Sequence, residues 1–235
     1  MTGALTKPIE LSLIVPVLNE IRLLPDFMES LQQQWSQPHE VLMIDGGSSD
    51  GSWEWLQTHW EKNSYQTITG RAQQMNFGAQ HATQKWLYFL HIDSRLPNNF
   101  DRIISEAIHS GARSGCFRLK FNRANWLLRR AAAGSKWNHL LCRGGDQSLF
   151  LSKKDFDRFH GYDCLYTVCE DLNLIKKLYT LGNFKVLPAD ILTSSRRFYH
   201  NGVTRLLFHF GMIHLSHWLG AGPNFLYRYY LRFVR

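Results

Sequence analysis

The sequence predicts an α/β fold built on a doubly wound, mostly parallel sheet. Short apolar runs at 11–15, 41–44 and 86–90 have the length and composition of strands buried on both faces. Segments with apolar residues at helical spacing follow the first two runs, and this alternation of strands and helices is typical of a parallel sheet. From residue 201 onward the composition becomes aromatic, apolar and basic, which predicts a C-terminal helical extension.

Composition narrows the class of protein. The chain has 235 residues, of which 44% are hydrophobic and 20% charged, so we expect a packed core. The net charge of +8 favours anionic partners: nucleotide phosphates, nucleic acid or an acidic lipid surface. The four cysteines form no Cys-x-x-Cys pair and no zinc spacing, which predicts reduced thiols. With no signal-peptide core and no apolar run of about 20 residues, we expect a cytoplasmic protein.

Four strand–helix repeats are predicted in the first hundred or so residues. The expected strands are 11–15, 41–44, a weaker 65–69 and 86–90, and the expected helices are 21–35, 53–60, 71–82 and 100–109. Asp50 is expected to cap the second helix, because Trp53, Leu56 and Trp60 after it share one helical face.

The second half of the chain is less regular. We expect a strand at 116–121, antiparallel or at an edge, because basic and apolar residues alternate there. The other expected elements are a helix at 125–141, an apolar strand at 148–151 after a Gly-rich turn, a helix at 170–180 and a core strand at 185–188.

Polar side chains follow the predicted strands, and ligands of open α/β sheets bind at the carboxyl ends of strands. These side chains are Asn19 and Glu20 after the first strand, Asp45 after the second, Arg71 after the third, and His91 and Asp93 after the fourth. A carboxylate can bind a base or ribose hydroxyl, an arginine can bind phosphate oxygens, and another carboxylate can hold a divalent cation. The pattern predicts a nucleotide diphosphate site. Without Gly-x-Gly-x-x-Gly or a Walker A sequence, a dehydrogenase-type dinucleotide fold is not expected.

Each of these residues also has an ordinary structural explanation. Asp45 and Asp93 could sit in plain turns, Arg71 could pair with a surface carboxylate, and Asn19 and Glu20 could cap the first helix. Glu170 and Asp171 could simply favour a helix N-terminus. The pair Asp146-Gln147, which follows two glycines, could be a turn or could contact the donor or acceptor. Arg196, Arg197 and His200 could be a solvated face or could close over the diphosphate.

Five motifs in this order resemble those of family 2 glycosyltransferases with the GT-A fold. They are IVPVLNE (14–20), IDGGSSDG (44–51), GRAQQMN (70–76), FLHID (89–93) and CED (169–171). The third and fourth motifs are similar to those of a smaller subgroup of soluble bacterial members, some of them associated with arsenosugar biosynthesis. The likeness extends from about 11 to 200, which implies a GT-A domain over 1–200 and an extension over 201–235.

The resemblance implies an inverting glycosyltransferase that moves a sugar from a nucleoside diphosphate sugar to a hydroxyl acceptor. It implies that Asp171, beside Glu170, is the general base, that Asp45 contacts the nucleotide base and that Arg71 contacts the diphosphate. The residues expected to bind the nucleotide sugar are Pro16, Val17, Asn19, Glu20, Asp45, Arg71, Gln74, Asp93, Gly145, Asp146 and Gln147.

The resemblance also implies a divalent cofactor, Mn²⁺ or Mg²⁺. Asp93 matches the last residue of the family's metal-binding Asp-x-Asp motif, whereas His91 stands where the first Asp is expected. A histidine can ligate Mn²⁺, but it removes a negative charge, so both metal affinity and metal dependence are open. We take Asp93 and His91 as the candidate metal ligands.

The C-terminal extension combines apolar and basic residues. Residues 206–219 are too few to span a bilayer, while the aromatics and arginines of 227–235 suit a peripheral contact with the inner membrane surface. The alternatives are packing on the domain or a homodimer through 203–235. His209, His214 and His217 interrupt this stretch, but their spacing does not favour a shared metal site.

Three other functions are weighed against sugar transfer. A nucleotidyltransferase would need a Gly-rich basic loop after the first strand, where this chain has Pro-Val-Leu-Asn-Glu. A nucleic-acid binder fits the charge, but the basic residues are spread along the chain rather than clustered in a recognised module. A catalytically degenerate GT-A protein acting as a membrane-surface binding or scaffold module is the main alternative, because His91 departs from the metal motif and the C-terminal tail is basic and aromatic.

Overall fold

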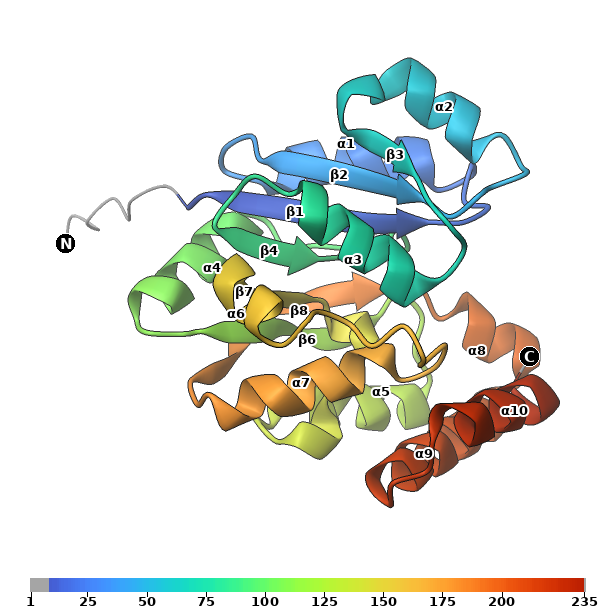
Figure 1. Ribbon diagram of the computed structural model, residues 1–235. Coiled ribbons are helices and arrows are strands. Elements are labelled where there is room, and N and C mark those ends of the chain that lie inside the picture. The colour runs from blue at the N-terminus through green and yellow to red at the C-terminus, as the bar shows by residue number, and fades with distance from the viewer. Residues whose placement is uncertain (1–8, 235) are drawn as a thin grey trace.

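The computed structural model describes residues 9–234. The outer ends of the expected domain (1–200) and extension (201–235), residues 1–8 and 235, lie outside the described residues. The described residues form one eight-stranded sheet in the order β3-β2-β1-β4-β7-β6-β8-β5 (Figure 1). The strands are β1 (Leu11–Val17), β2 (Glu40–Asp45), β3 (Ser64–Gln66), β4 (Trp86–Phe89), β5 (Ser94–Arg95), β6 (Ser114–Phe121), β7 (Leu149–Ser152) and β8 (Phe184–Thr193).

Most of the sheet is parallel, as predicted. β1 pairs in parallel with β2 and β4, β2 with β3, and β6 with β8. β7 is antiparallel to both β4 and β6, and the two-residue β5 is antiparallel to β8. The strands β1, β2, β3 and β4 therefore end at one edge of the sheet, which is where the polar residues of the sequence were expected to meet.

Helices cover both faces of the sheet. They are α1 (Leu24–Gln34), α2 (Ser52–His59), α3 (Arg71–His81), α4 (Phe100–His109), α5 (Trp126–Ala133), α6 (Lys153–Arg158), α7 (Glu170–Thr180), α8 (Arg196–Asn201), α9 (Val203–Trp218) and α10 (Pro223–Phe233). One core cluster packs α1, α2 and α4 on one face, and a second packs α3, α6 and α7 on the other. This arrangement confirms the doubly wound α/β class.

Several expected elements differ in detail. The helix expected at 125–141 ends at Ala133, and short 3-10 turns follow from Gly134, a residue that weakens helices. The strand expected at 116–121, as antiparallel or at an edge, is β6, which lies inside the sheet, antiparallel to β7 and parallel to β8. The helix after Asp50 has Gly51 as its N-cap, although the Asp50 carboxylate accepts the Ser52 backbone N–H at 3.0 Å.

The C-terminal extension packs on the rest of the chain. A third apolar cluster joins Leu206, Ile213 and Leu226 of α9 and α10 to Leu128 of α5 and Leu172 of α7. The two last helices lie side by side at one end of the molecule (Figure 1). Within residues 9–234, no helix is long and apolar enough to cross a membrane. The domain boundary near residue 200 remains our proposal.

Candidate active site

Asp45 stands at the end of β2, where its side chain is fully buried. Its Oδ2 accepts the backbone N–H groups of Gly47 and Ser48, at 2.8 and 3.0 Å, and the side-chain amide of Gln66 at 3.1 Å. Its Oδ1 is buried and has no hydrogen-bond partner among the described residues. One oxygen therefore fixes the carboxylate, and the other is an unused acceptor beside the sheet edge.

The loop after β1 is held by the loop after β2. The backbone of Asn19 has a φ of +56°. Its side-chain oxygen accepts the Ser49 backbone N–H at 2.8 Å, and its backbone N–H donates to Ser48 Oγ at 2.9 Å. The Glu20 backbone N–H donates to Ser52 Oγ at 2.9 Å. These bonds fix the IVPVLNE and IDGGSSDG segments against each other, so the two strand ends form one rigid rim.

Arg71 is the meeting point of the acidic residues. It begins α3, its side chain is 51% exposed, and its Nη1 lies 3.5 Å from Glu170 Oε1. Its guanidinium also interacts electrostatically with Asp146, Asp171 and Asp93. Residues far apart in sequence thus share one charged cleft. Among the described residues, Glu170 is the carboxylate with which Arg71 forms an ion pair.

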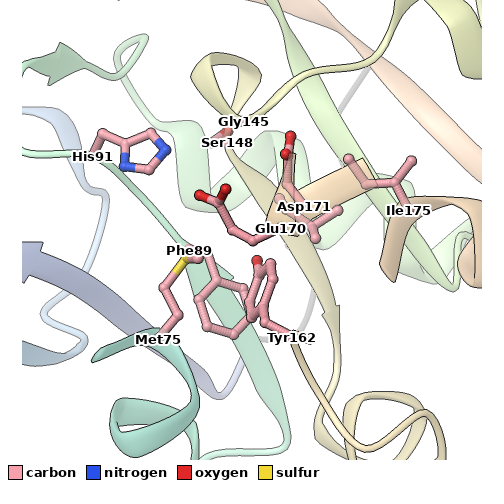
Figure 2. Close-up of a pocket in the computed structure, with 10 residues that line it drawn as sticks. Met75, Phe89, His91, Gly145, Ser148, Tyr162, Glu170, Asp171 and Ile175 are labelled. Atoms are coloured by element: carbon pink, nitrogen blue, oxygen red, sulfur yellow. The ribbon is translucent and has the colours of Figure 1, made fainter. Parts of the chain in front are cut away.

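The Glu-Asp pair lies in the first turn of α7. Both residues line a cavity of about 20 Å³, which is room for one water-sized group. Figure 2 shows both carboxylates directed into this cavity, with Asp171 pointing toward Gly145. Asp171 Oδ2 is buried and has no hydrogen-bond partner among residues 9–234. Burial raises the pKa of the Glu170 carboxyl group and that of the Asp171 carboxyl group above their ordinary values. Each group therefore holds a proton more readily than a solvated acid.

His91 and Asp93 follow β4 and are both partly buried. Burial, then the nearby Arg71 charge, lowers the pKa of His91 to about 3, so its ring is neutral and has a lone pair available. Burial, then the charge of Asp146, raises the pKa of Asp93 to about 6. The Asp93 carboxylate therefore lies where a further positive charge would stabilise its ionised form.

The acidic residues fit an open divalent-cation site rather than a closed one. In the described part of the chain, no group of three or more His, Cys, Asp or Glu side chains is arranged to hold a metal by itself. Mg²⁺-type sites that act on phosphates use one or two carboxylates and take their other ligands from the substrate and water. Asp93, close to the charge of Asp146, satisfies that pattern.

A family model described as "Glycosyl transferase family 2" matches residues 12–160, which is more than half of the chain. The chain belongs to glycosyl transferase family 2. No curated protein matches it.

The fold of this family 2 member is similar to that of two solved glycosyltransferases. Residues 1–349 of S. aureus TarS in complex with UDP-GlcNAc are 16% identical, with a TM-score of 0.65, over 80% of this chain and 59% of that TarS chain. A mannosyltransferase from Pyrobaculum calidifontis in complex with GDP-Man and Mn²⁺ is 19% identical, with a TM-score of 0.66, over 96% of this chain and 70% of the other. The chain spans less than two thirds of the TarS chain, and at these identities the likeness establishes the GT-A fold.

Four residues expected to bind the nucleotide sugar have structural contacts instead of open polar groups. The buried side chain of Gln74 donates to the Val17 and Ile44 carbonyls at 2.8 and 2.7 Å, and so clamps the ends of β1 and β2. Gln147 is buried and donates to the Cys142 carbonyl at 2.8 Å. Pro16 and Val17 lie within β1. That these four residues contact the nucleotide sugar remains a prediction.

Sequence reasoning missed the structural roles of two residues that shape the cleft. Asn76 binds the backbone of Tyr162 twice, donating to its carbonyl at 2.8 Å and accepting its N–H at 2.9 Å. This pair positions the Tyr162 ring, which lines the cavity beside Glu170. The second residue is Gly145, which was predicted to contact the nucleotide sugar. Its role in leaving room beside Asp171 was not predicted. Asn76 lies within the GRAQQMN motif, so the motif itself was the available signal.

Arg196, at the start of α8, closes one side of the cleft. Its Nη2 lies 3.3 Å from Glu20 Oε2, which links the end of β8 to the loop after β1. It also interacts electrostatically with Asp93. Arg197 instead donates to the Tyr230 hydroxyl at 2.6 Å, so it supports the C-terminal helices. His200 is exposed.

Gly145 keeps space open beside the candidate base Asp171 and the candidate metal ligand His91. A Cβ added there would lie 3.3 Å from Asp171 Oδ2, which is tight enough to shift this carboxylate by a few tenths of an ångström, and 3.4 Å from His91 Nε2, which is close to an ordinary contact. We expect Gly145→Ala to lower kcat about tenfold without unfolding the protein, because small displacements of reacting groups are costly. Steady-state kinetics and a melting curve measure this. Gly144→Ala is the matched control, because its Cβ would meet nothing within 4 Å; equal activity of the two variants would contradict the assignment.

Proposed function

We propose that this protein transfers a sugar from a nucleoside diphosphate sugar to a hydroxyl acceptor and inverts the anomeric centre. The observation that carries the proposal is the position of Arg71 among Asp93, Asp146, Glu170 and Asp171 at the carboxyl edge of the sheet. A guanidinium binds phosphate oxygens through paired N–H groups. A carboxylate nearby can then act on the acceptor.

Each side chain receives a role from its contacts. The unpartnered Oδ1 of Asp45 would accept an N–H of the nucleotide base. Arg71 would bind the diphosphate, and Glu170 would hold the Arg71 guanidinium in place. Asp171 would take the proton of the acceptor hydroxyl as that oxygen attacks the sugar carbon. A single displacement of this kind inverts the anomeric centre and needs one base, which the unpartnered Oδ2 of Asp171 supplies.

A divalent cation fits the charge balance of the cleft. The carboxylates outnumber Arg71 and Arg196, so a diphosphate would be repelled unless positive charge came with it. Asp93 would hold this cation, with His91 as a neutral candidate ligand beside the cleft. When bound, Mn²⁺ or Mg²⁺ would stabilise the negative charge of the leaving diphosphate.

We expect Mn²⁺ to tighten the binding of a nucleoside diphosphate through Asp93. Isothermal titration of UDP and GDP, with and without Mn²⁺, should show a gain that Asp93→Asn reduces about tenfold, because the amide lacks the charge that holds the cation. Asp26→Asn, in the first turn of α1, is the matched surface control. Identical titrations with and without the metal would show that Asp93 holds no cation.

Transfer itself is tested with a panel of nucleoside diphosphate sugars and hydroxyl acceptors, including the UDP-GlcNAc and GDP-Man found in the related structures. Released diphosphate and a glycosylated product with inverted configuration are expected. A chain that binds donors but never turns them over would instead support the degenerate binding or scaffold module. The arsenosugar link and a cytoplasmic location remain predictions.

A further inference from the structure

Helix α9 is apolar on two opposite faces. One face buries Leu206 and Ile213 in the third core cluster. On the opposite face Phe208 is 62% exposed, Leu215 47% and Leu219, just past the helix, 70%. These three positions are spaced by seven and four residues, which places them in one stripe along a helix. An exposed apolar stripe of this kind marks a contact surface rather than a solvated face.

The exposed stripe of α9 continues onto α10. The seam between the two helices is built from His209, whose Nδ1 lies 2.8 Å from the Tyr229 hydroxyl and whose ring stacks on Phe233 at 5.2 Å. The Phe208 ring of α9 lies 5.4 Å from the His209 ring, and the Phe225 ring of α10 lies 6.4 Å from the Tyr229 ring. Exposed rings of both helices therefore lie next to this seam.

This surface is defined here as the outer face of the hairpin: Phe208, Leu215, Leu219, Phe225, Arg228 and Arg232. All six side chains are exposed. Residues 191–235 contain no Asp or Glu. Within residues 9–234, neither Arg228 nor Arg232 forms an ion pair with a carboxylate. The outer face therefore combines apolar side chains with uncompensated positive charge.

We propose that the outer face of the hairpin docks on an anionic lipid bilayer. Aromatic and aliphatic side chains would enter the interfacial region, and the arginines would meet the negative headgroups. The 16 residues of α9 are fewer than the roughly 20 needed to span a bilayer, so the helix would lie in the surface. A second copy of this chain is a poorer occupant, because two acid-free faces would bring like charges together.

The hairpin is fixed beside the catalytic cleft. His217 near the end of α9 lies 3.0 Å from Asn173 Oδ1 through its Nε2, and Asn173 is two residues after Asp171 on α7. A bilayer bound to the outer face would therefore hold the cleft close to the membrane surface. This docking does not depend on sugar transfer, so it is measured without donor or acceptor.

Flotation of the full chain with lipid vesicles tests the proposal. We expect the protein to float with vesicles of phosphatidylcholine containing about one third phosphatidylglycerol, and to float far less with phosphatidylcholine alone. Phe208→Ser with Leu215→Ser should weaken this binding at least tenfold, because it removes two apolar anchors. Arg228→Gln with Arg232→Gln should weaken it about fivefold per arginine at low salt.

The matched control carries Ile68→Ser with Lys62→Gln, which removes an apolar side chain that is 71% exposed and a charge, both far along the chain from the hairpin. This variant should bind the anionic vesicles as the wild type does, and all variants should show the same melting temperature. Absence of flotation by the wild type, or undiminished flotation of the Phe208/Leu215 variant, would overturn the proposal. If the wild type binds no vesicles but forms a dimer in light scattering that the Phe208/Leu215 variant does not form, the outer face is a self-association surface and the proposal is overturned.

Discussion

Replacing Asp171 with Asn should nearly abolish sugar transfer and leave donor binding intact. The buried Oδ2 has no competing hydrogen bond among the described residues, and burial raises the pKa of the carboxyl group, so it is a better base than a solvated aspartate. An amide of the same shape cannot take the acceptor's proton. General-base catalysis contributes a factor of 10²–10⁴, and we expect kcat to fall about a thousandfold, measured by turnover of the best donor with its Kd determined calorimetrically.

The neighbouring Glu170 provides the comparison for this experiment. Glu170→Gln removes the partner of Arg71 but keeps the base, so we expect it to raise KM and retain most of kcat. Asp171→Asn should also melt no lower than the wild type at pH 8, because a carboxylate whose pKa rises on folding is unfavourable to stability above that pKa. Turnover retained in Asp171→Asn and lost in Glu170→Gln would reverse the two roles.

The pH dependence of transfer should reflect the same carboxyl group. Because burial raises the pKa of Asp171, protonation should inactivate the wild type well above the ordinary value of 3.8. A kcat profile measured between pH 4 and 8 should therefore fall on its acidic side. A flat profile throughout that range would indicate that no carboxylate with a raised pKa takes part.

Replacing Asp101 with Ala should cause a large loss of stability. Asp101 is 1% exposed in the first turn of α4, and its carboxylate accepts the Ser36 backbone N–H at 2.9 Å and the Ser36 hydroxyl at 2.7 Å. His39 Nε2 lies 3.0 Å from the same group. The network ties α4 to the loop between α1 and β2. Because Ala leaves these buried groups without a partner, we expect a loss of about 3 kcal/mol in urea denaturation.

The contribution of Asp101 should also depend on pH. Burial raises its pKa, but the hydrogen bonds from His39 and Ser36 outweigh this and lower it to about 2. The stability it supplies is therefore complete above the ordinary value of 3.8 and is lost as the pH falls through about 2. Asp157→Ala, at an exposed position of α6, is the control. A difference below about 0.5 kcal/mol between the two variants would contradict this account.

Strands buried on both faces were the part of the fold that sequence could predict. β1, β2 and β4 are mostly apolar, because each lies between two layers of helices, and α7 has a clear 3.6-residue period. β5 escaped notice because its two residues carry no period at all. Helix α6 has an N-cap, Ser152, whose side chain accepts the Asp155 backbone N–H at 3.1 Å. The helix is too short to show a periodic pattern in the sequence.

The same limit applies to the site. Arg71 and Asp93 could be placed from the rule that ligands gather at the carboxyl ends of strands. The clamp made by Gln74 could not, because both of its acceptors are backbone carbonyls whose positions depend on the folded sheet. The contact between Arg196 and Glu20 joins positions at opposite ends of the domain sequence, so only the tertiary structure reveals it.

The central claim is that side chains from separate strand ends converge around one diphosphate. A crystal structure of the protein with a bound nucleoside diphosphate and Mn²⁺ tests it most directly. We expect the base against Asp45 and the diphosphate within hydrogen-bonding distance of Arg71, with Asp93 on the cation. A nucleotide bound away from the cleft, or a diphosphate that touches neither Arg71 nor Asp93, would contradict the claim.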